Sequence, residues 1–180
     1  SDLEKLVEEI KRLLKELKER VTKNSEDMKR EVERHKELVK KLKKRIEDLL
    51  RELEDAVRKG ELDEKKVKEL KDEIRKLVKE LRDHSREVKK RLDDSNRKVE
   101  EEVRKLKEDI DKLVKEVRDK GVEKREDLER VVEEVKKEID KIVEENRDSS
   151  RKLKERLDEA NEELERRVEE IERRIDEKAR

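Results

Sequence analysis

Apolar residues recur every three or four positions along this chain, in three stretches of similar length. The residues expected to face inward run from Leu3 to Val57 in the first stretch, where 15 steps cover 54 residues. The resulting average of 3.6 residues per step matches a straight α-helix rather than the 3.5 of a strict heptad coil. The same spacing returns from Val67 to Val117 and from Leu128 to Ile175. The pattern therefore predicts three long amphipathic helices.

The two glycines, Gly60 and Gly121, divide the chain into thirds. Each follows a helical pattern and suits the left-handed residue that ends a helix. Asp63 is a good N-cap for the second helix, and Ser1 with Glu4 has the spacing of a capping box. Residues 122–124 give a weaker start signal for the third helix. We predict helices at about 2–59, 63–120 and 123–179.

Pairs of adjacent apolar residues, such as Leu13-Leu14 and Leu49-Leu50, widen the apolar stripe. Neighbours about 100° apart on a helix can face two partner helices, which neither a two-helix seam nor a lone charged helix would need. Short loops make consecutive helices antiparallel. We therefore expect residues 1–180 to form one all-α domain, an up-down-up antiparallel three-helix bundle of nearly straight helices. A monomer is expected, and the alternative is a domain-swapped or self-associated oligomer that opens the third helix.

The composition narrows the function classes. Charged residues make up 63% of the chain, yet 57 basic and 57 acidic residues cancel, so there is no basic surface for nucleic acid. Aromatic residues and cysteine are absent, and no apolar run approaches the roughly 20 residues that span a bilayer. We expect no membrane contact, no targeting signal and no natural localisation, but a soluble protein suited to recombinant cytoplasmic expression.

Thirteen residues are neither charged, nor apolar, nor glycine, and eleven of them fall in three short windows. Ser1 and Thr22 lie outside the set. The eleven residues are Asn24, Ser25 and His35 in the first third, His84, Ser85, Ser95 and Asn96 in the second, and Asn146, Ser149, Ser150 and Asn161 in the last.

Folding the chain at its glycines places these windows side by side. Contacting residues should have numbers that sum to about 120 across Gly60 and about 242 across Gly121, and the first and third helices should be offset by about 122. One predicted layer contains Asn24, Ser25, Ser95, Asn96 and Asn146, with Asn24 facing Asn96, Ser25 facing Ser95, and Asn146 beside both asparagines. A second contains His35, facing His84 or Ser85, together with Asn161, while Ser149 and Ser150 lie between the layers.

Buried polar layers have a physical use in such a bundle. Leu and Val stripes pack almost as well after a slip of one turn, whereas a misplaced Asn or His loses its partners at a cost of about 1–3 kcal/mol per buried group. The layers should therefore select one register and topology, provided that every donor and acceptor is satisfied.

With these features the chain resembles de novo designed helical bundles that contain buried hydrogen-bond networks. The resemblance covers the whole length and rests on a surface of Lys, Glu, Arg and Asp, on equal helices joined at Lys59-Gly60 and Lys120-Gly121, and on the confined Asn, Ser and His residues. It implies a structural scaffold, with no required partner, cofactor or enzymatic activity.

Three chemical alternatives attach to the histidines. A metal site at His35 and His84 would have only Ser and Asn as further neighbours, and zinc needs three or four good ligands. A catalytic triad built from Ser25 or Ser85 would lack an oxyanion hole and a cleft. Buried neutral histidines could instead make the bundle sensitive to acid, because burial lowers their pKa, unless nearby Asp residues reverse that shift by pairing with the imidazolium.

Overall fold

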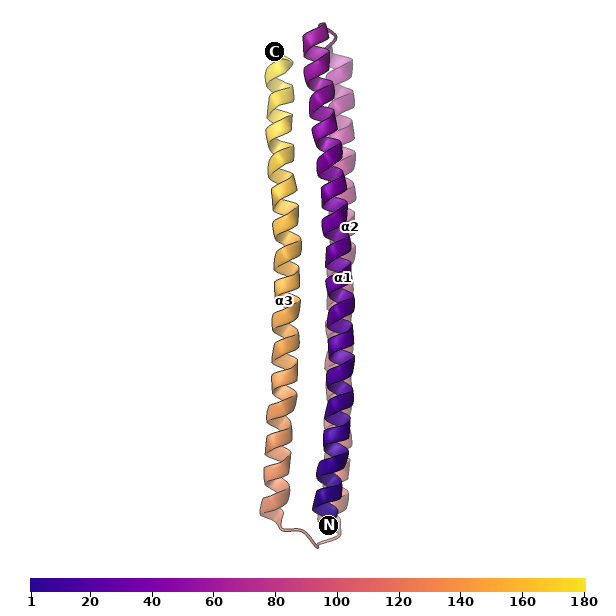
Figure 1. Cartoon of the computed structure of the whole chain (residues 1–180), viewed down its shortest axis with the longest axis vertical. Coiled ribbons are helices and arrows are strands. Elements are labelled where there is room, and N and C mark those ends of the chain that lie inside the picture. Colours follow the sequence, from indigo (N-terminus) through magenta and orange to yellow (C-terminus); the bar gives the residue numbers. More distant parts are fainter. The chain divides into compact units, whose positions relative to one another are not determined.

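The chain folds into three α-helices in a computed structural model that describes residues 1–180. The helices are α1 (Asp2–Lys59), α2 (Glu64–Asp119) and α3 (Arg125–Lys178), coloured along the sequence in Figure 1. Short connections at residues 60–63 and 120–124 join them, and there are no strands. The predicted helix boundaries are correct to within two residues.

The helix ends use most of the signals expected from the sequence. Gly60 and Gly121 adopt φ angles of 69° and 67°, in the left-handed region that favours glycine. The Asp63 carboxylate accepts a hydrogen bond from the Lys66 amide at 2.8 Å, which makes Asp63 the N-cap of α2. The hydroxyl of Ser1 accepts one from the Glu4 amide at 3.3 Å. Of the four helix ends at the two connections, two are thus defined by a glycine and one by the Asp63 cap.

The start of α3 differs from the prediction. This helix begins at Arg125 because the carbonyl of Lys124 accepts the first helical bond, from the amide of Leu128 at 3.3 Å. The side chain of Glu123 does not cap α3. It accepts a hydrogen bond from the backbone amide of Leu3 at 3.0 Å, so the second connection caps the start of α1.

The chain divides into two compact units, and each helix contributes a segment to both. Unit 1 comprises Ser1–Met28 and Arg91–Lys152, and unit 2 comprises Lys29–Lys90 and Leu153–Arg180. In each unit the buried apolar residues of all three helices meet in one core. The core of unit 1 is formed by Leu6, Ile10, Leu17, Val99, Val103, Leu106, Ile110, Val114, Val117, Leu128, Val135, Ile139 and Ile142. The core of unit 2 is formed by Leu42, Ile46, Leu49, Leu50, Leu53, Leu70, Ile74, Leu77, Leu81, Leu164, Val168, Ile171 and Ile175.

Contacting residues give the direction of each helix pair. Between α1 and α2 their numbers sum to 119, both for Asn24 with Ser95 in unit 1 and for His35 with His84 in unit 2. A constant sum means that the two helices are antiparallel. Between α1 and α3 the difference stays between 120 and 126, so these helices are parallel. The chain is therefore an all-α, up-down-up three-helix bundle, as predicted. Its organisation as one domain over 1–180 stays a prediction.

Two details of packing correct the sequence-based expectations. Asn96 contacts Asn146, at the predicted sum of 242, but it also bonds to Ser150, at a sum of 246, and Ser85 and Asn161 meet at 246 as well. The turn extends to Lys124, which moves the fold-back point beyond Gly121 and shifts the pairing by about one helical turn. At the end of α1, Val57 is 37% exposed, because Ala56 and Leu53 take the inward positions there.

None of the three helices contains a stretch long and apolar enough to cross a membrane.

Candidate functional site

The polar residues singled out in the sequence gather in two clusters, one in each unit. The Asn/Ser cluster of unit 1 consists of Asn24, Ser25, Ser95, Asn96, Asn146, Ser149 and Ser150, and the histidine cluster of unit 2 consists of His35, His84, Ser85 and Asn161. His35, Ser85, Ser95 and Ser150 are buried and the other seven are partly buried. Thr22, in contrast, is exposed.

Hydrogen bonds within the Asn/Ser cluster connect all three helices. The side-chain amide of Asn24 donates to the hydroxyl of Ser95 and, at 3.3 Å, to its carbonyl oxygen. Asn96 receives a bond from Asn146 at 3.4 Å and donates to Ser150 at 2.8 Å. Asn96 thus bonds to two residues of α3.

The predicted contact between Asn96 and Asn146 is present, and the other partners in this cluster differ from those expected. Asn24 bonds to Ser95 rather than to Asn96 or Asn146, and Ser25 bonds to Ser149 of α3 at 3.1 Å rather than to Ser95. Ser149 and Ser150 therefore belong to the cluster instead of lying outside it. The sum of 246 between α2 and α3 brings Ser150 to Asn96, and the offset of 124 between α1 and α3 brings Ser149 to Ser25.

The histidine cluster forms a continuous chain across the three helices of unit 2. Nδ1 of His35 lies 2.8 Å from Nδ1 of His84, and Nε2 of His35 lies 2.6 Å from Oδ1 of Asn161. The amide of Asn161 donates to the hydroxyl of Ser85 at 2.8 Å. The predicted approach of His35 to His84 is present, and the alternative partner, Ser85, bonds to Asn161 instead.

The two imidazole rings meet edge to edge. Their planes differ by 4° and their centroids are 5.1 Å apart. Two rings stacked face to face would be separated by about 3.5 Å or more, the van der Waals contact distance, so the 2.8 Å between the nitrogens requires in-plane contact. The Nδ1 lone pair of one ring therefore points at the Nδ1 hydrogen of the other.

The bond to Asn161 determines which nitrogens carry protons. Because Oδ1 of Asn161 only accepts, Nε2 of His35 must donate, which leaves Nδ1 of His35 as an acceptor. Nδ1 of His84 then donates to it. A proton added to Nδ1 of His35 would put hydrogens on both facing Nδ1 atoms and break the contact.

The surroundings of His35 oppose its protonation. Its exposed fraction is 0%, and burial lowers the pKa of His35 below the ordinary value. The bond to Asn161 acts in the opposite direction but is the smaller effect, and the charges of His84 and Lys89 lower the pKa further. Lys89 of α2 is paired with Asp158 of α3 at 2.7 Å. The charge that acts on His35 from outside the cluster is thus a cation, so no Asp reverses the shift.

Both clusters meet the condition for a favourable buried network. Every buried side-chain nitrogen and oxygen has a hydrogen-bond partner. Apolar residues one turn away on each helix seal the histidine cluster, and those that are fully or almost fully buried are Val32, Leu81, Val88, Leu157 and Leu164.

The arrangement does not assemble the other chemical sites considered. No group of three or more His, Asp or Glu side chains is placed to hold a metal ion. The hydroxyl of Ser25 bonds to Ser149 and that of Ser85 bonds to Asn161, so neither hydroxyl is hydrogen-bonded to an imidazole.

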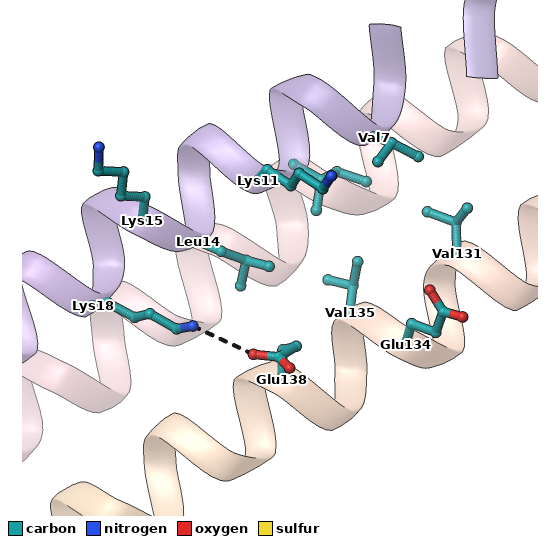
Figure 2. Close-up of a pocket in the computed structure, with 10 residues that line it drawn as sticks. Val7, Lys11, Leu14, Lys15, Lys18, Val131, Glu134, Val135 and Glu138 are labelled. Carbon is teal, nitrogen blue, oxygen red and sulfur yellow. Dashed lines mark hydrogen bonds and ion pairs between the residues drawn. The ribbon is translucent and has the colours of Figure 1, made fainter. Parts of the chain in front are cut away.

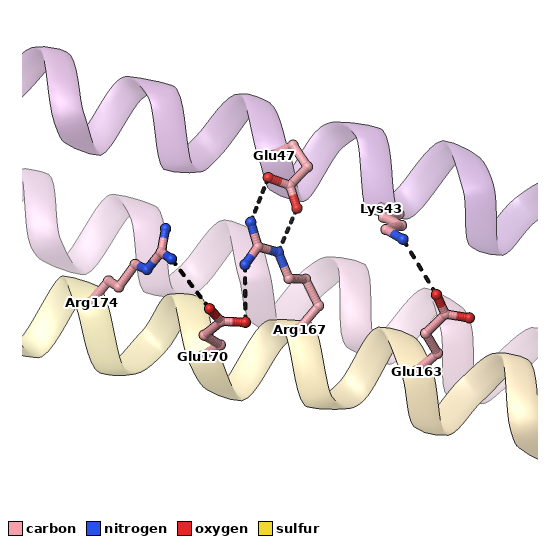
Figure 3. A network of polar contacts seen from close by, with 6 residues as sticks. All are labelled: Lys43, Glu47, Glu163, Arg167, Glu170 and Arg174. Carbon is pink, nitrogen blue, oxygen red and sulfur yellow. Dashed lines mark hydrogen bonds and ion pairs between the residues drawn. The ribbon is translucent and has the colours of Figure 1, made fainter.

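An interhelical contact that the sequence pattern does not predict joins Arg167 and Glu47. Arg167 of α3 donates two hydrogen bonds to the carboxylate of Glu47 on α1, at 2.5 and 2.8 Å, and its third nitrogen lies 3.0 Å from Glu170 (Figure 3). The contact lowers the pKa of Glu47 and raises that of Arg167. The offset of 120 between Glu47 and Arg167 is the available signal, but many Lys, Arg and Glu residues share that offset.

Comparison with solved structures shows a likeness to a designed protein. A solved "computationally designed three helix bundle" is 26% identical, with 98% of this chain and 83% of that chain covered and a TM-score of 0.38. At this TM-score the likeness adds nothing to the fold established by the contacts. No protein-family profile and no curated protein sequence matches the chain.

Proposed function

We propose that this chain is a designed structural scaffold, in which the two polar clusters select one register of the three helices. The observation that supports this most strongly is that the eleven residues interrupt an otherwise apolar interior and yet leave no buried side-chain nitrogen or oxygen without a partner. Random polar substitutions in a core would leave unsatisfied groups, each costing about 1–3 kcal/mol. The predominantly charged surface and the near-equal helices of 58, 56 and 54 residues support the same proposal.

A shift of register would cost a large free energy. Three bonds of the histidine cluster and five of the Asn/Ser cluster join different helices. Sliding one helix by a turn breaks most of them, while the apolar residues find equivalent neighbours. Several unsatisfied groups would cost on the order of 10 kcal/mol, which is comparable to the whole stability of a typical domain.

Replacing the histidine cluster with apolar residues tests the proposal. The variant carries His35→Leu, His84→Leu, Ser85→Ala and Asn161→Leu, and its parent is a chain in which the residues of the Asn/Ser cluster are already Leu or Ala, so that only the histidine cluster is left to select the register. Because the chain has no cysteine, cysteines introduced at residues 43 and 163 report the observed register of α1 and α3, where Lys43 and Glu163 pair at 3.4 Å. Cysteines at 43 and 159 report a register one turn away. A short bifunctional thiol reagent then measures both.

We expect this parent to cross-link only the 43–163 pair and the apolar variant to cross-link both pairs while staying helical. If the apolar variant keeps the single cross-link as cleanly as the parent chain, the histidine cluster does not select the register.

The imidazole pair supports a second candidate function, a scaffold that loosens in acid. A proton on Nδ1 of His35 breaks its contact with His84 in the folded chain, whereas the unfolded chain has no such contact to lose. The pKa of His35 is lowered on folding, so its contribution to stability is complete above the unfolded value of about 6.5 and is lost as the pH falls toward the folded value. One extra proton in the unfolded state costs about 1.4 kcal/mol per pH unit.

Urea unfolding at pH 7.5 and pH 5.0, compared with a His35→Asn, His84→Asn double variant, tests this candidate. We expect the unmodified chain to lose up to about 2 kcal/mol more than the double variant, because about 1.5 pH units lie between the unfolded value and pH 5.0 and one proton accounts for at most about 1.4 kcal/mol per unit. Equal losses in the two proteins would remove the histidines as the source of any acid sensitivity.

A further inference from the structure

A groove between α1 and α3 in unit 1 combines an apolar floor with charged side chains along its rim. It has a volume of about 410 Å³, and Val7 and Leu14 of α1 face Val131 and Val135 of α3 across it (Figure 2). Val7, Leu14 and Val131 stay partly exposed although they belong to the apolar stripes, whereas Val135 is buried. The groove therefore presents uncovered apolar surface that the chain's own side chains do not fill.

The charges at the rim are unevenly distributed. Lys11 and Lys15 stand along the α1 side and make no ion pair, while Glu134 stands unpaired on the α3 side. Lys18 and Glu138 pair across the groove at 3.4 Å and close one end (Figure 2). Two free cations thus face one free carboxylate, and the rim carries a net positive charge.

We propose that this groove binds one linear anionic amphiphile of the fatty-acid class. The alkyl chain lies on Val7, Leu14, Val131 and Val135, and the carboxylate contacts the ammonium groups of Lys11 and Lys15. The proposal is independent of the scaffold function, because it uses none of the residues of the two polar clusters.

Size and charge favour this occupant over others. A volume of 410 Å³ lies near the lower end of the roughly 300–1,000 Å³ typical of small-molecule sites. A cationic amphiphile would place its head group beside Lys11 and Lys15, and a neutral one would gain nothing from them. The apolar floor requires an alkyl chain, and the rim requires a negative head group.

Titration with sodium decanoate, kept below the concentration at which it forms micelles, tests the proposal. Isothermal calorimetry gives the affinity, and spectra of the chain labelled at Val and Leu methyl groups locate the ligand. We expect one molecule per chain, shifts centred on Val7, Leu14, Val131 and Val135, and an affinity that rises about two- to fourfold for each added methylene between hexanoate and decanoate.

Three variants separate head-group and chain contacts. Lys11→Gln with Lys15→Gln should weaken decanoate binding about fivefold at low salt, because two exposed charge contacts are lost. The matched control, Lys112→Gln with Lys115→Gln, changes two exposed lysines of α2 that do not line the groove and should leave the affinity unchanged. Val131→Phe should fill the groove and abolish binding.

Four results would overturn the proposal. These are the absence of decanoate binding, methyl shifts away from the groove, equal affinity for decyltrimethylammonium, and an unchanged affinity in the Lys11/Lys15 variant. The lysine variants alter exposed side chains only, so they decide the question even if Val131→Phe perturbs the helices.

Discussion

Asn161 is the residue on which the histidine cluster depends most, because it satisfies two neighbours at once. It accepts the Nε2 hydrogen of His35 at 2.6 Å and donates to Ser85 at 2.8 Å. We predict that Asn161→Leu, which keeps the branched shape but removes both polar atoms, destabilises the fold by about 3 kcal/mol. His35 and Ser85 each lose a partner in a buried position, at about 1–3 kcal/mol apiece. The added apolar surface of a half-buried leucine returns about 1 kcal/mol.

Urea unfolding followed by circular dichroism at pH 7.5 measures this loss. Glu159→Leu is the matched control, since it introduces the same side chain at an exposed position of α3 and should change the stability by less than about 0.5 kcal/mol. The fully apolar variant of the cluster should recover most of the loss, because it leaves no polar group without a partner. The reasoning is refuted if Asn161→Leu costs less than about 0.5 kcal/mol, or if the fully apolar variant is the less stable of the two.

Three further predictions concern contacts outside the clusters. Arg167→Gln should cost about 1 kcal/mol at low salt and less in concentrated salt, because it removes the partly exposed bidentate pair with Glu47; urea unfolding at two salt concentrations measures it. Gly60→Ala should cost about 1 kcal/mol in the same assay, purely from backbone strain, since φ is 69° and no atom lies near the added methyl. Glu123→Ala should speed amide exchange at Leu3 without affecting the start of α3, because Glu123 caps α1 instead.

The helices and their directions could be predicted because the relevant signals are local. A period of 3.6 residues places the apolar stripe, and a glycine with positive φ ends each of the first two helices. The predicted start of α3, residue 123, lies two residues before the observed one because no capping side chain marks the start of this helix. Glu123, the one good acceptor in that turn, contacts a residue 120 positions away. Such a long-range contact leaves no local pattern in the sequence.

Which residues bond to each other within a cluster is harder to predict from the sequence than which residues belong to the cluster. A sum of residue numbers gives the level at which two helices meet, but adjacent residues such as Asn24 and Ser25 point about 100° apart and face different helices. Asn24 consequently bonds to α2 and Ser25 to α3. His35 and His84 were paired correctly because their side chains are long enough to meet across α1 and α2 at the predicted level.

The two clusters differ in one respect that gives acid a local effect. Asn and Ser do not titrate near neutral pH, so the bonds of the Asn/Ser cluster keep their strength in mild acid, whereas a proton added to Nδ1 of His35 breaks the contact between His35 and His84. Opening should therefore begin in unit 2. We predict that, between pH 7.5 and 5, hydrogen exchange corrected for its intrinsic pH dependence loses protection around residues 35, 84 and 161 before residues 24, 96 and 146. The His35→Asn, His84→Asn variant should show no such order. Loss of protection at the same pH in both units of the parent chain would mean that the acid response does not originate at the histidines.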